Sequence, residues 1–217
     1  MKNNITELVF ILDRSGSMSG LEDDTIGGYN SLLKKQLEEE GEAVITTVLF
    51  DDKYELLHDR INLKAVEPIT SKEYYVRGCT ALLDALGKTI NKIKTAQKNT
   101  NEAYRANNVL FVITTDGMEN ASREFSYKKI KRLVEQQTEL GWEFIFLGAN
   151  IDAIETAGKF GIRASRAQNF HADGEGVRNN YECMAAPIAS FRSCGSLSDD
   201  WGSKIEEDFE SRKNAAS

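Results

Sequence analysis

Residues 8–18 read Leu8-Val9-Phe10-Ile11-Leu12-Asp13-Arg14-Ser15-Gly16-Ser17-Met18, an apolar run that ends in an acid and two hydroxyls at alternate positions. Five consecutive apolar residues without polar alternation are typical of a central strand in a parallel sheet, which is covered on both faces. The polar residues therefore follow where the strand leaves the core. Asp13, Ser15 and Ser17 offer one carboxylate and two hydroxyl oxygens. Hard oxygen ligands of this kind suit magnesium, calcium or manganese.

By itself this motif leaves two interpretations open, because Asp, Ser and Gly also compose an ordinary strand-to-helix turn. The rest of the chain favours the metal site. A second apolar run, residues 109–115, ends in Asp116-Gly117, and a loop that precedes a helix carries Thr80. Loops at the carboxyl ends of different strands gather at one edge of an open α/β sheet, where ligands bind. We therefore expect three separate segments to meet at one cation.

Together these motifs resemble the von Willebrand factor A domain and its metal-ion-dependent adhesion site. The family's Asp-x-Ser-x-Ser motif matches Asp13, Ser15 and Ser17. Its threonine matches Thr80, and its aspartate in a Thr-Asp-Gly setting matches Asp116. The resemblance covers roughly residues 5–162 and indicates a standalone bacterial or phage-type member of the family.

The resemblance implies which cation and which partner such a site takes. In the family the cation is usually magnesium, with manganese or calcium as alternatives here. It is held by the three hydroxyls directly and by the two carboxylates directly or through water. Magnesium keeps several waters, one of which the carboxylate of a partner can displace. We therefore expect a partner protein that supplies an Asp or Glu, and an ATPase is one such partner, because standalone bacterial members often work beside ATPases.

Composition and charge restrict the class of protein. The chain has 217 residues and a formal charge of −7, which argues against a general nucleic-acid binder. The amino terminus lacks the pattern of a secretory signal, and no stretch approaches the roughly 18 apolar residues of a membrane span. Three cysteines without a CxxC pair predict neither a disulfide framework nor a zinc site. We expect a cytoplasmic protein that binds neither nucleic acid nor membrane.

Hydrophobic periodicity predicts the elements that follow the first strand. Apolar residues at spacings of three or four predict a helix over about residues 22–39, which Gly41 stops. Strands are expected over residues 43–50 and 54–58. The turn between them is so short that the two strands must be antiparallel, because a parallel crossover needs a dozen or more residues.

The same periodicity continues along the chain. Helices are expected around residues 82–93 and 130–137, and the polar stretch 94–105 is expected to fray into a loop. Residues 142–148 indicate a further buried strand and residues 154–160 a short helix. Alternation of strands and helices predicts a Rossmann-like three-layer α/β sandwich, with a mainly parallel central sheet, one antiparallel edge strand and helices on both faces.

The carboxyl-terminal part is harder to interpret. Residues 1–192 are predicted to form the von Willebrand factor A-like domain, with a last helix around residues 175–191 that Pro187 weakens. Residues 193–217 are predicted to be a tail or a docking segment. A frayed tail is the default, but apolar residues that recur every four positions from Trp201 also fit an amphipathic segment that docks on a neighbour or on the domain itself.

An enzyme is the competing class. Asp13 and Asp116 with a metal could serve a phosphatase or phosphotransferase, but no glycine-rich phosphate-binding motif follows the first strand. Serine hydrolysis would need a base, and His58 and His171 are the chain's two histidines. We interpret both as surface residues and expect a binding module without enzymatic activity. A structural domain with a vacant site is a third reading.

Three polar residues near the expected site have two interpretations each. Asp84 either orients Thr80 or only favours the positive end of the first helical turn. Glu119 and Asn120 either hold water on the metal through hydrogen bonds or simply solvate a loop.

Overall fold

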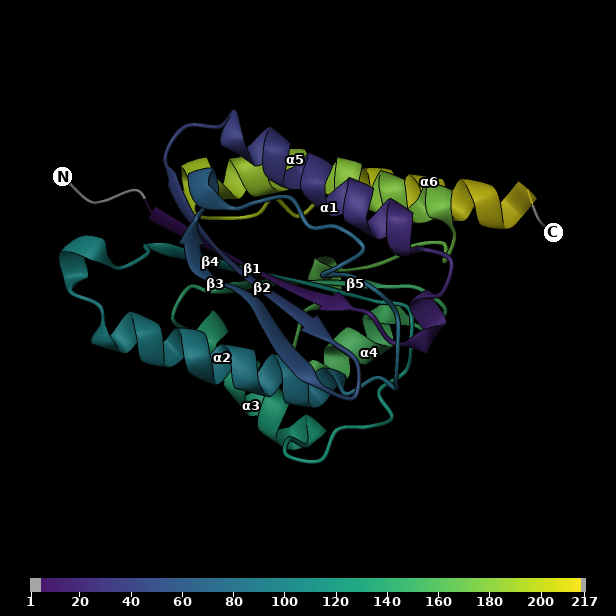
Figure 1. Ribbon diagram of the computed structural model, residues 1–217, viewed down its shortest axis with the longest axis horizontal. Coiled ribbons are helices and arrows are strands. Elements are labelled where there is room, and N and C mark those ends of the chain that lie inside the picture. The colour runs from purple at the N-terminus through teal and green to yellow at the C-terminus, as the bar shows by residue number, and fades with distance from the viewer. Residues whose placement is uncertain (1–4, 216–217) are drawn as a thin grey trace.

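In the computed structural model, which describes residues 5–215, the apolar run forms the centre of strand β1 (Ile5–Asp13). The sheet has the strand order β3-β2-β1-β4-β5-β6, and Figure 1 labels the strands β1 to β5. Strand β1 pairs in parallel with β2 (Glu42–Phe50) and β4 (Asn108–Thr115). The parallel part continues through β5 (Glu143–Gly148) and β6 (Ala167–Asn169). The mainly parallel sheet of the prediction is confirmed.

One edge of the sheet is antiparallel, as the short turn predicts. Strand β3 (Tyr54–Asn62) pairs antiparallel with β2 and runs four residues beyond the predicted end at residue 58. Its register against β2 shifts near Thr47, and Arg60 has a φ of 51°. Such irregularity bends an edge strand and is common at sheet edges.

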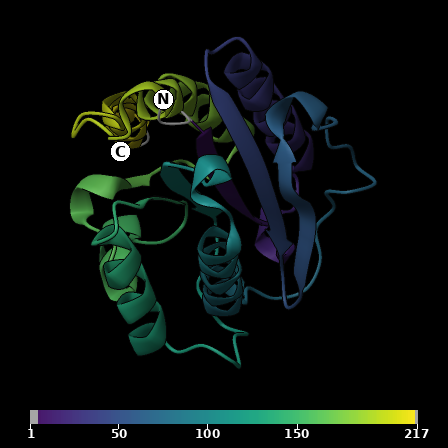
Figure 2. The same ribbon diagram turned by 90° about the vertical axis from the view of Figure 1, so that its left-hand side faces the viewer.

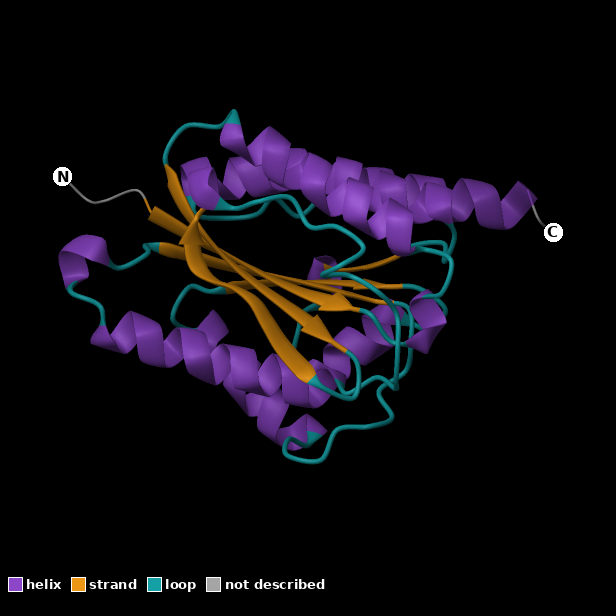
Figure 3. Ribbon diagram, in the orientation of Figure 1, coloured by secondary structure: helices purple, strands orange, loops and turns teal. Residues whose placement is uncertain are grey.

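Helices cover both faces of the sheet (Figures 1, 2 and 3). One layer contains α1 (Glu22–Leu37), α5 (Gly174–Cys194) and α6 (Ser203–Ala215). The other layer contains α2 (Leu82–Asn99), α3 (Tyr127–Thr138) and α4 (Ala153–Phe160). The predicted three-layer sandwich is confirmed.

Alternate side chains of β1 enter two separate cores. Leu8, Phe10 and Leu12 pack on the side of α1 and α5, whereas Val9 and Ile11 pack on the side of α2. All five are buried because successive side chains of a strand point to opposite faces, and both faces are covered. This double burial holds the end of β1, and therefore Asp13, in a fixed place.

The predicted fraying of residues 94–105 is wrong for the first half of that stretch. Helix α2 continues to Asn99, and only a short 3-10 turn over Glu102–Tyr104 precedes β4. The polar residue Gln97 is buried, and its side-chain amide donates to the carboxylate of Glu7 at 2.5 Å. This buried hydrogen bond between α2 and β1 takes the place of an apolar contact, which is why the lack of apolar residues in this stretch did not end the helix.

The default expectation of a frayed tail is also wrong. Trp201 and Ile205 are buried in the same core as α1 and α5, and α6 packs against α5 and β6. The Trp201 indole donates to the carbonyl of Ser165 at 2.7 Å. The buried guanidinium of Arg166 donates to the carbonyl of Leu197 at 2.9 Å. Docking on the domain itself is therefore the arrangement of the carboxyl-terminal segment.

The predicted ranges 1–192 and 193–217 include residues 1–4 and 216–217, which lie outside the described residues. Helix α5 runs through Pro187 to Cys194, one residue beyond the start of the predicted tail. Its buried stripe of Met184, Ile188 and Phe191 keeps it on the core despite the proline. No described helix combines the length and apolar character needed to cross a membrane.

Candidate metal centre

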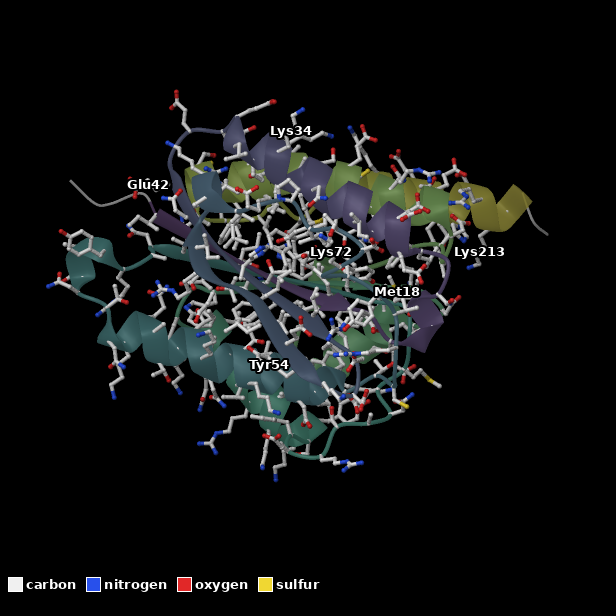
Figure 4. The ribbon with its side chains drawn as sticks, viewed as in Figure 1. Met18, Lys34, Glu42, Tyr54, Lys72 and Lys213 are labelled. Atoms are coloured by element: carbon white, nitrogen blue, oxygen red, sulfur yellow. The ribbon has the colours of Figure 1, made fainter. Side chains whose placement is uncertain are left out.

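Three loops meet where the parallel strands end. Asp13 is the last residue of β1, Asp116 follows β4 directly, and Thr80 lies two residues before α2. Met18, labelled in Figure 4, lies on the loop after β1 at this edge of the sheet. It is buried under the loop, as expected of an apolar residue there.

The structure brings the three predicted hydroxyls together. The Ser15 and Ser17 Oγ atoms are 3.0 Å apart, and Thr80 Oγ1 donates to Ser15 Oγ at 3.0 Å. Ser17 Oγ donates to Asp116 Oδ1 at 2.5 Å. Four of the five predicted site residues therefore form one connected set of oxygen atoms, although they come from three distant parts of the chain.

Asp13 lies behind this set, and both of its carboxylate oxygens are held. Oδ1 accepts from the Ser15 amide at 2.7 Å, and Oδ2 accepts from Thr115 Oγ1 at 2.6 Å. Burial raises the pKa of the Asp13 carboxyl to about 6; the charge of Asp116 acts in the same direction, whereas the hydrogen bonds from Thr115 and Ser15 oppose it. An isolated buried carboxylate is costly, and a nearby cation removes that cost.

Asp116 has the same electrostatic difficulty. Burial raises its pKa, although the hydrogen bond from Ser17 lowers it. Its Oδ2 atom is buried without a hydrogen-bond partner. Buried polar atoms are normally paired, so an orphaned carboxylate oxygen beside a second carboxylate fits a cation ligand.

A glycine leaves the space in which such a cation fits. A Cβ atom on Gly117 would lie 3.0 Å from Ser17 Oγ and 3.0 Å from Thr80 Oγ1. Within residues 5–215, no three His, Cys, Asp or Glu side chains are grouped to hold a metal, so a cation here depends on the hydroxyls. Hydroxyl and carboxylate oxygens suit hard divalent cations, and thiolate- or imidazole-rich zinc sites differ from this set.

Two residues that the sequence reasoning did not select position Asp13. Thr115 binds its carboxylate, and the buried Tyr74 hydroxyl donates to its backbone carbonyl at 2.5 Å. A local signal for Thr115 was its place directly before Asp116 in the run Thr114-Thr115-Asp116. Successive side chains of a strand point to opposite faces, so the two threonines of this run lie on different sides of the sheet. No local signal indicates Tyr74, which lies 61 positions away.

Asn120 positions Thr80. Its side-chain oxygen accepts from the Thr80 backbone amide at 2.9 Å, and its backbone amide donates to the Thr80 carbonyl at 3.0 Å. Glu119 instead accepts from the Leu83 amide at 2.9 Å, in the first turn of α2. Both residues therefore hold the loops together, and the interpretation as simple loop solvation is wrong.

Asp84 also acts on a loop. Its carboxylate accepts from the amides of Arg123, Glu124 and Phe125, each at 2.9 Å. These contacts differ from the interpretation in which Asp84 orients Thr80, whereas the alternative position in the first turn of α2 is where Asp84 lies. Asp84 instead ties the start of α2 to the loop that follows β4.

The two histidines lie outside this set of oxygen atoms. His58 is buried, so its interpretation as a surface residue is wrong, and its Nδ1 atom is 3.0 Å from Thr47 Oγ1. His171 is half-buried and stacks on Phe209 with ring centroids 4.7 Å apart.

No family model matches this sequence, and no curated protein matches it. Solved structures do resemble the fold. The manganese-loaded TRAP protein of Plasmodium vivax matches with a TM-score of 0.59 and 18% identity over 82% of this chain and 72% of that one. The mussel byssus protein PTMP1, with a zinc-occupied MIDAS motif, matches with a TM-score of 0.58 and 11% identity over 87% of this chain and 47% of that one.

A von Willebrand factor type A protein from Catenulispora acidiphila matches with a TM-score of 0.58 and 15% identity, over 87% of this chain and 43% of that one. This chain therefore has the von Willebrand factor A fold. It spans about half the length of the mussel protein.

Proposed function

We propose that this chain is a divalent-cation-dependent protein-binding module. The observation that carries the proposal is the orphaned, buried Oδ2 atom of Asp116, whose Oδ1 atom accepts from the last of three hydroxyls linked in the order Thr80, Ser15 and Ser17. Asp13, Ser15, Ser17, Thr80 and Asp116 would hold the cation. The cation would neutralise two carboxylates and leave a coordination position that points to solvent.

Magnesium is the cation that we favour. It prefers oxygen ligands, keeps water in its shell, and can exchange one water for the carboxylate of a partner. Two solved structures of the same fold are a manganese-loaded protein and a protein with zinc in its MIDAS motif, which supports a divalent ion at this place in the fold. Manganese or calcium would serve the same oxygen set.

The proposed partner is a protein that supplies an Asp or Glu side chain, with an ATPase as one candidate. Met118, which follows Gly117, is 75% exposed and offers an apolar contact beside the metal. All three cysteines are free, which supports a reducing compartment such as the cytoplasm.

Thermal unfolding with and without metal tests the proposal. The wild type is treated with a chelator, and magnesium, manganese, calcium or zinc is then added back over a concentration series. A ligand that binds only the folded state stabilises it by about 2.7 kcal/mol at a hundredfold excess over its dissociation constant. We expect this rise in the wild type and its loss in Asp13→Asn.

Glu7→Gln is the matched control. Glu7 is also a buried carboxylate of β1, but it lies near the opposite end of the strand and pairs with Arg60 at 2.8 Å. We expect this variant to lose stability yet keep the full metal-dependent rise. Equal rises in the wild type and Asp13→Asn, or no rise with any metal, would contradict the proposal.

A further inference from the structure

A cleft of about 1010 Å³ lies beside the candidate metal centre. It is lined by the β2–β3 turn, the first turns of α2 and the loop over residues 120–124. Cys79 and Ala81, the two chain neighbours of Thr80, both line it. The cleft is therefore continuous with the surface at which a partner bound to the metal would lie.

Internal hydrogen bonds hold the two loops that flank the cleft. In the β2–β3 turn, the Asp51 carboxylate accepts from the Lys53 amide at 2.6 Å. On the other side, the Asp84 carboxylate accepts from three successive amides of residues 123–125. The cleft thus exists before any partner binds, so little ordering is needed to use it.

The charges along the cleft are unevenly paired. Lys88 and Glu124 neutralise one another at 2.6 Å, and the hydrogen bonds to Asp84 occupy its carboxylate. Lys53 and Arg123 are exposed, one on each flanking loop, and neither side chain pairs with a carboxylate of residues 5–215. Asp52 is the remaining charged side chain of the lining. Two cations and one anion are therefore free to meet a ligand.

We propose that the partner segment carries a second acidic side chain, which enters this cleft between Lys53 and Arg123. The inference rests on the proposed function, because the metal fixes the first carboxylate beside Thr80. Neighbouring residues of the same segment then pass over the cleft mouth. The chain has a formal charge of −7, so its net charge disfavours the approach of an acidic segment. The two cations would therefore set the direction in which the segment lies.

Defined peptides test this inference. One probe carries a single Asp among Gly and Ser residues, and a second set adds a Glu at different spacings on either side of that Asp. Affinities are measured from amide chemical shifts of the labelled protein in magnesium and again in chelator. We expect at least one spacing to bind about twofold to fivefold more tightly than the single-acid peptide, the range that an exposed ion pair supplies.

The double variant K53Q/R123Q decides whether the cleft is responsible. The readout is the affinity ratio of the best two-acid peptide to the single-acid peptide, compared between this variant and a control of the same net charge. The control K34Q/K98Q removes the same charge from α1 and from the last turn of α2 (Lys34 is labelled in Figure 4). We expect the ratio to fall to about one in K53Q/R123Q and to persist in the control.

Three results would overturn the inference. The first is an affinity ratio of one in the wild type, and the second is a ratio in K53Q/R123Q that equals the wild-type ratio. In both cases magnesium-dependent binding of the single-acid peptide would leave the proposed function intact. If no peptide binds while magnesium still stabilises the fold, the acidic-segment partner is wrong and only metal binding stands. Failure of the proposed function itself is recognised separately, by the absence of any metal-dependent rise in unfolding temperature.

Discussion

Arg14 and Asp51 form an ion pair from which water is excluded. Arg14 Nε lies 3.1 Å from Asp51 Oδ2, and neither side chain has any exposed surface. Asp51 also binds Arg77 at 2.6 Å, and Arg14 reaches Glu55 at 2.6 Å. Because Arg14 follows Asp13 directly, this network fixes the start of the loop after β1 against the β2–β3 turn.

Removing the shared carboxylate should be costly. In Asp51→Asn, the buried Arg14 loses its closest buried anion, and breaking such a pair typically costs about 3 to 5 kcal/mol. The neighbouring Asp52 is exposed and forms no ion pair among the described residues, so Asp52→Asn should change the free energy of unfolding by less than about 0.5 kcal/mol. Urea unfolding measures both. Similar values for the two variants would mean that the buried pair contributes little.

The order of stability of Asp116→Asn and the wild type should reverse when metal is added. Without metal, burial raises the pKa of both Asp13 and Asp116, so removing the charge of Asp116 should leave the variant at least as stable as the wild type. With saturating magnesium, only the wild type should gain about 2 to 3 kcal/mol. Calorimetry in chelator and in magnesium gives both rankings. A variant that is less stable in chelator by more than about 1 kcal/mol would contradict this account.

Gly117→Ala should fill the space between the hydroxyls. The new methyl group would lie 3.0 Å from Ser17 Oγ and from Thr80 Oγ1, so we expect magnesium affinity to fall about tenfold or more, a loss of about 1.4 kcal/mol. Gly158→Ala is the matched control, because nothing lies within 4 Å of its added methyl group in α4. It should stabilise the protein by about 0.5 to 1 kcal/mol and leave magnesium affinity unchanged. Titration calorimetry with magnesium compares the two.

Asp84 should give the fold an acid-sensitive contact. Burial raises the pKa of Asp84, but the amides of Arg123, Phe125 and Glu124 outweigh it and hold the pKa below its usual value. A carboxyl with a lowered folded pKa stabilises the fold above its unfolded pKa, about 3.9, and loses that contribution as the pH falls through the folded pKa.

The free energy of unfolding of the wild type should therefore exceed that of Asp84→Asn by about 1 to 3 kcal/mol at pH 7. This difference should shrink below about pH 4. Urea unfolding of both proteins across this range tests the sign. A difference that stays constant with pH would show that the charge of Asp84 is unimportant.

Trp201 should anchor the carboxyl-terminal segment to the domain. Its side chain is buried and its indole is hydrogen-bonded to Ser165, so Trp201→Ala should cost about 3 kcal/mol or more. Leu140 is 73% exposed, and Leu140→Ala should stay within about 0.5 kcal/mol of the wild type. Unfolding should be followed by far-ultraviolet circular dichroism, because this signal does not depend on the tryptophan that the variant lacks. A cost near zero for Trp201→Ala would mean that the segment packs only weakly.

Much of the fold followed from local patterns. The unbroken apolar run of β1 indicated double burial, and the three-residue turn after β2 required an antiparallel edge strand. The periodic apolar residues of α1 and α3 placed both helices within a few residues of their ends. The pattern failed at Gln97, because a buried hydrogen bond to Glu7 substitutes there for an apolar contact.

The candidate site divides in the same way. The sequence alone determined that the sheet is mainly parallel and which three segments carry the oxygen ligands. Both depend on patterns among residues that are close together in the chain. Only the tertiary structure decided that Tyr74 and Thr115 hold Asp13, that Asp51 pairs with Arg14, and that Trp201 enters the core. These contacts join residues far apart in the chain, and a local hydrophobic period carries no information about which distant side chain will meet a buried polar group.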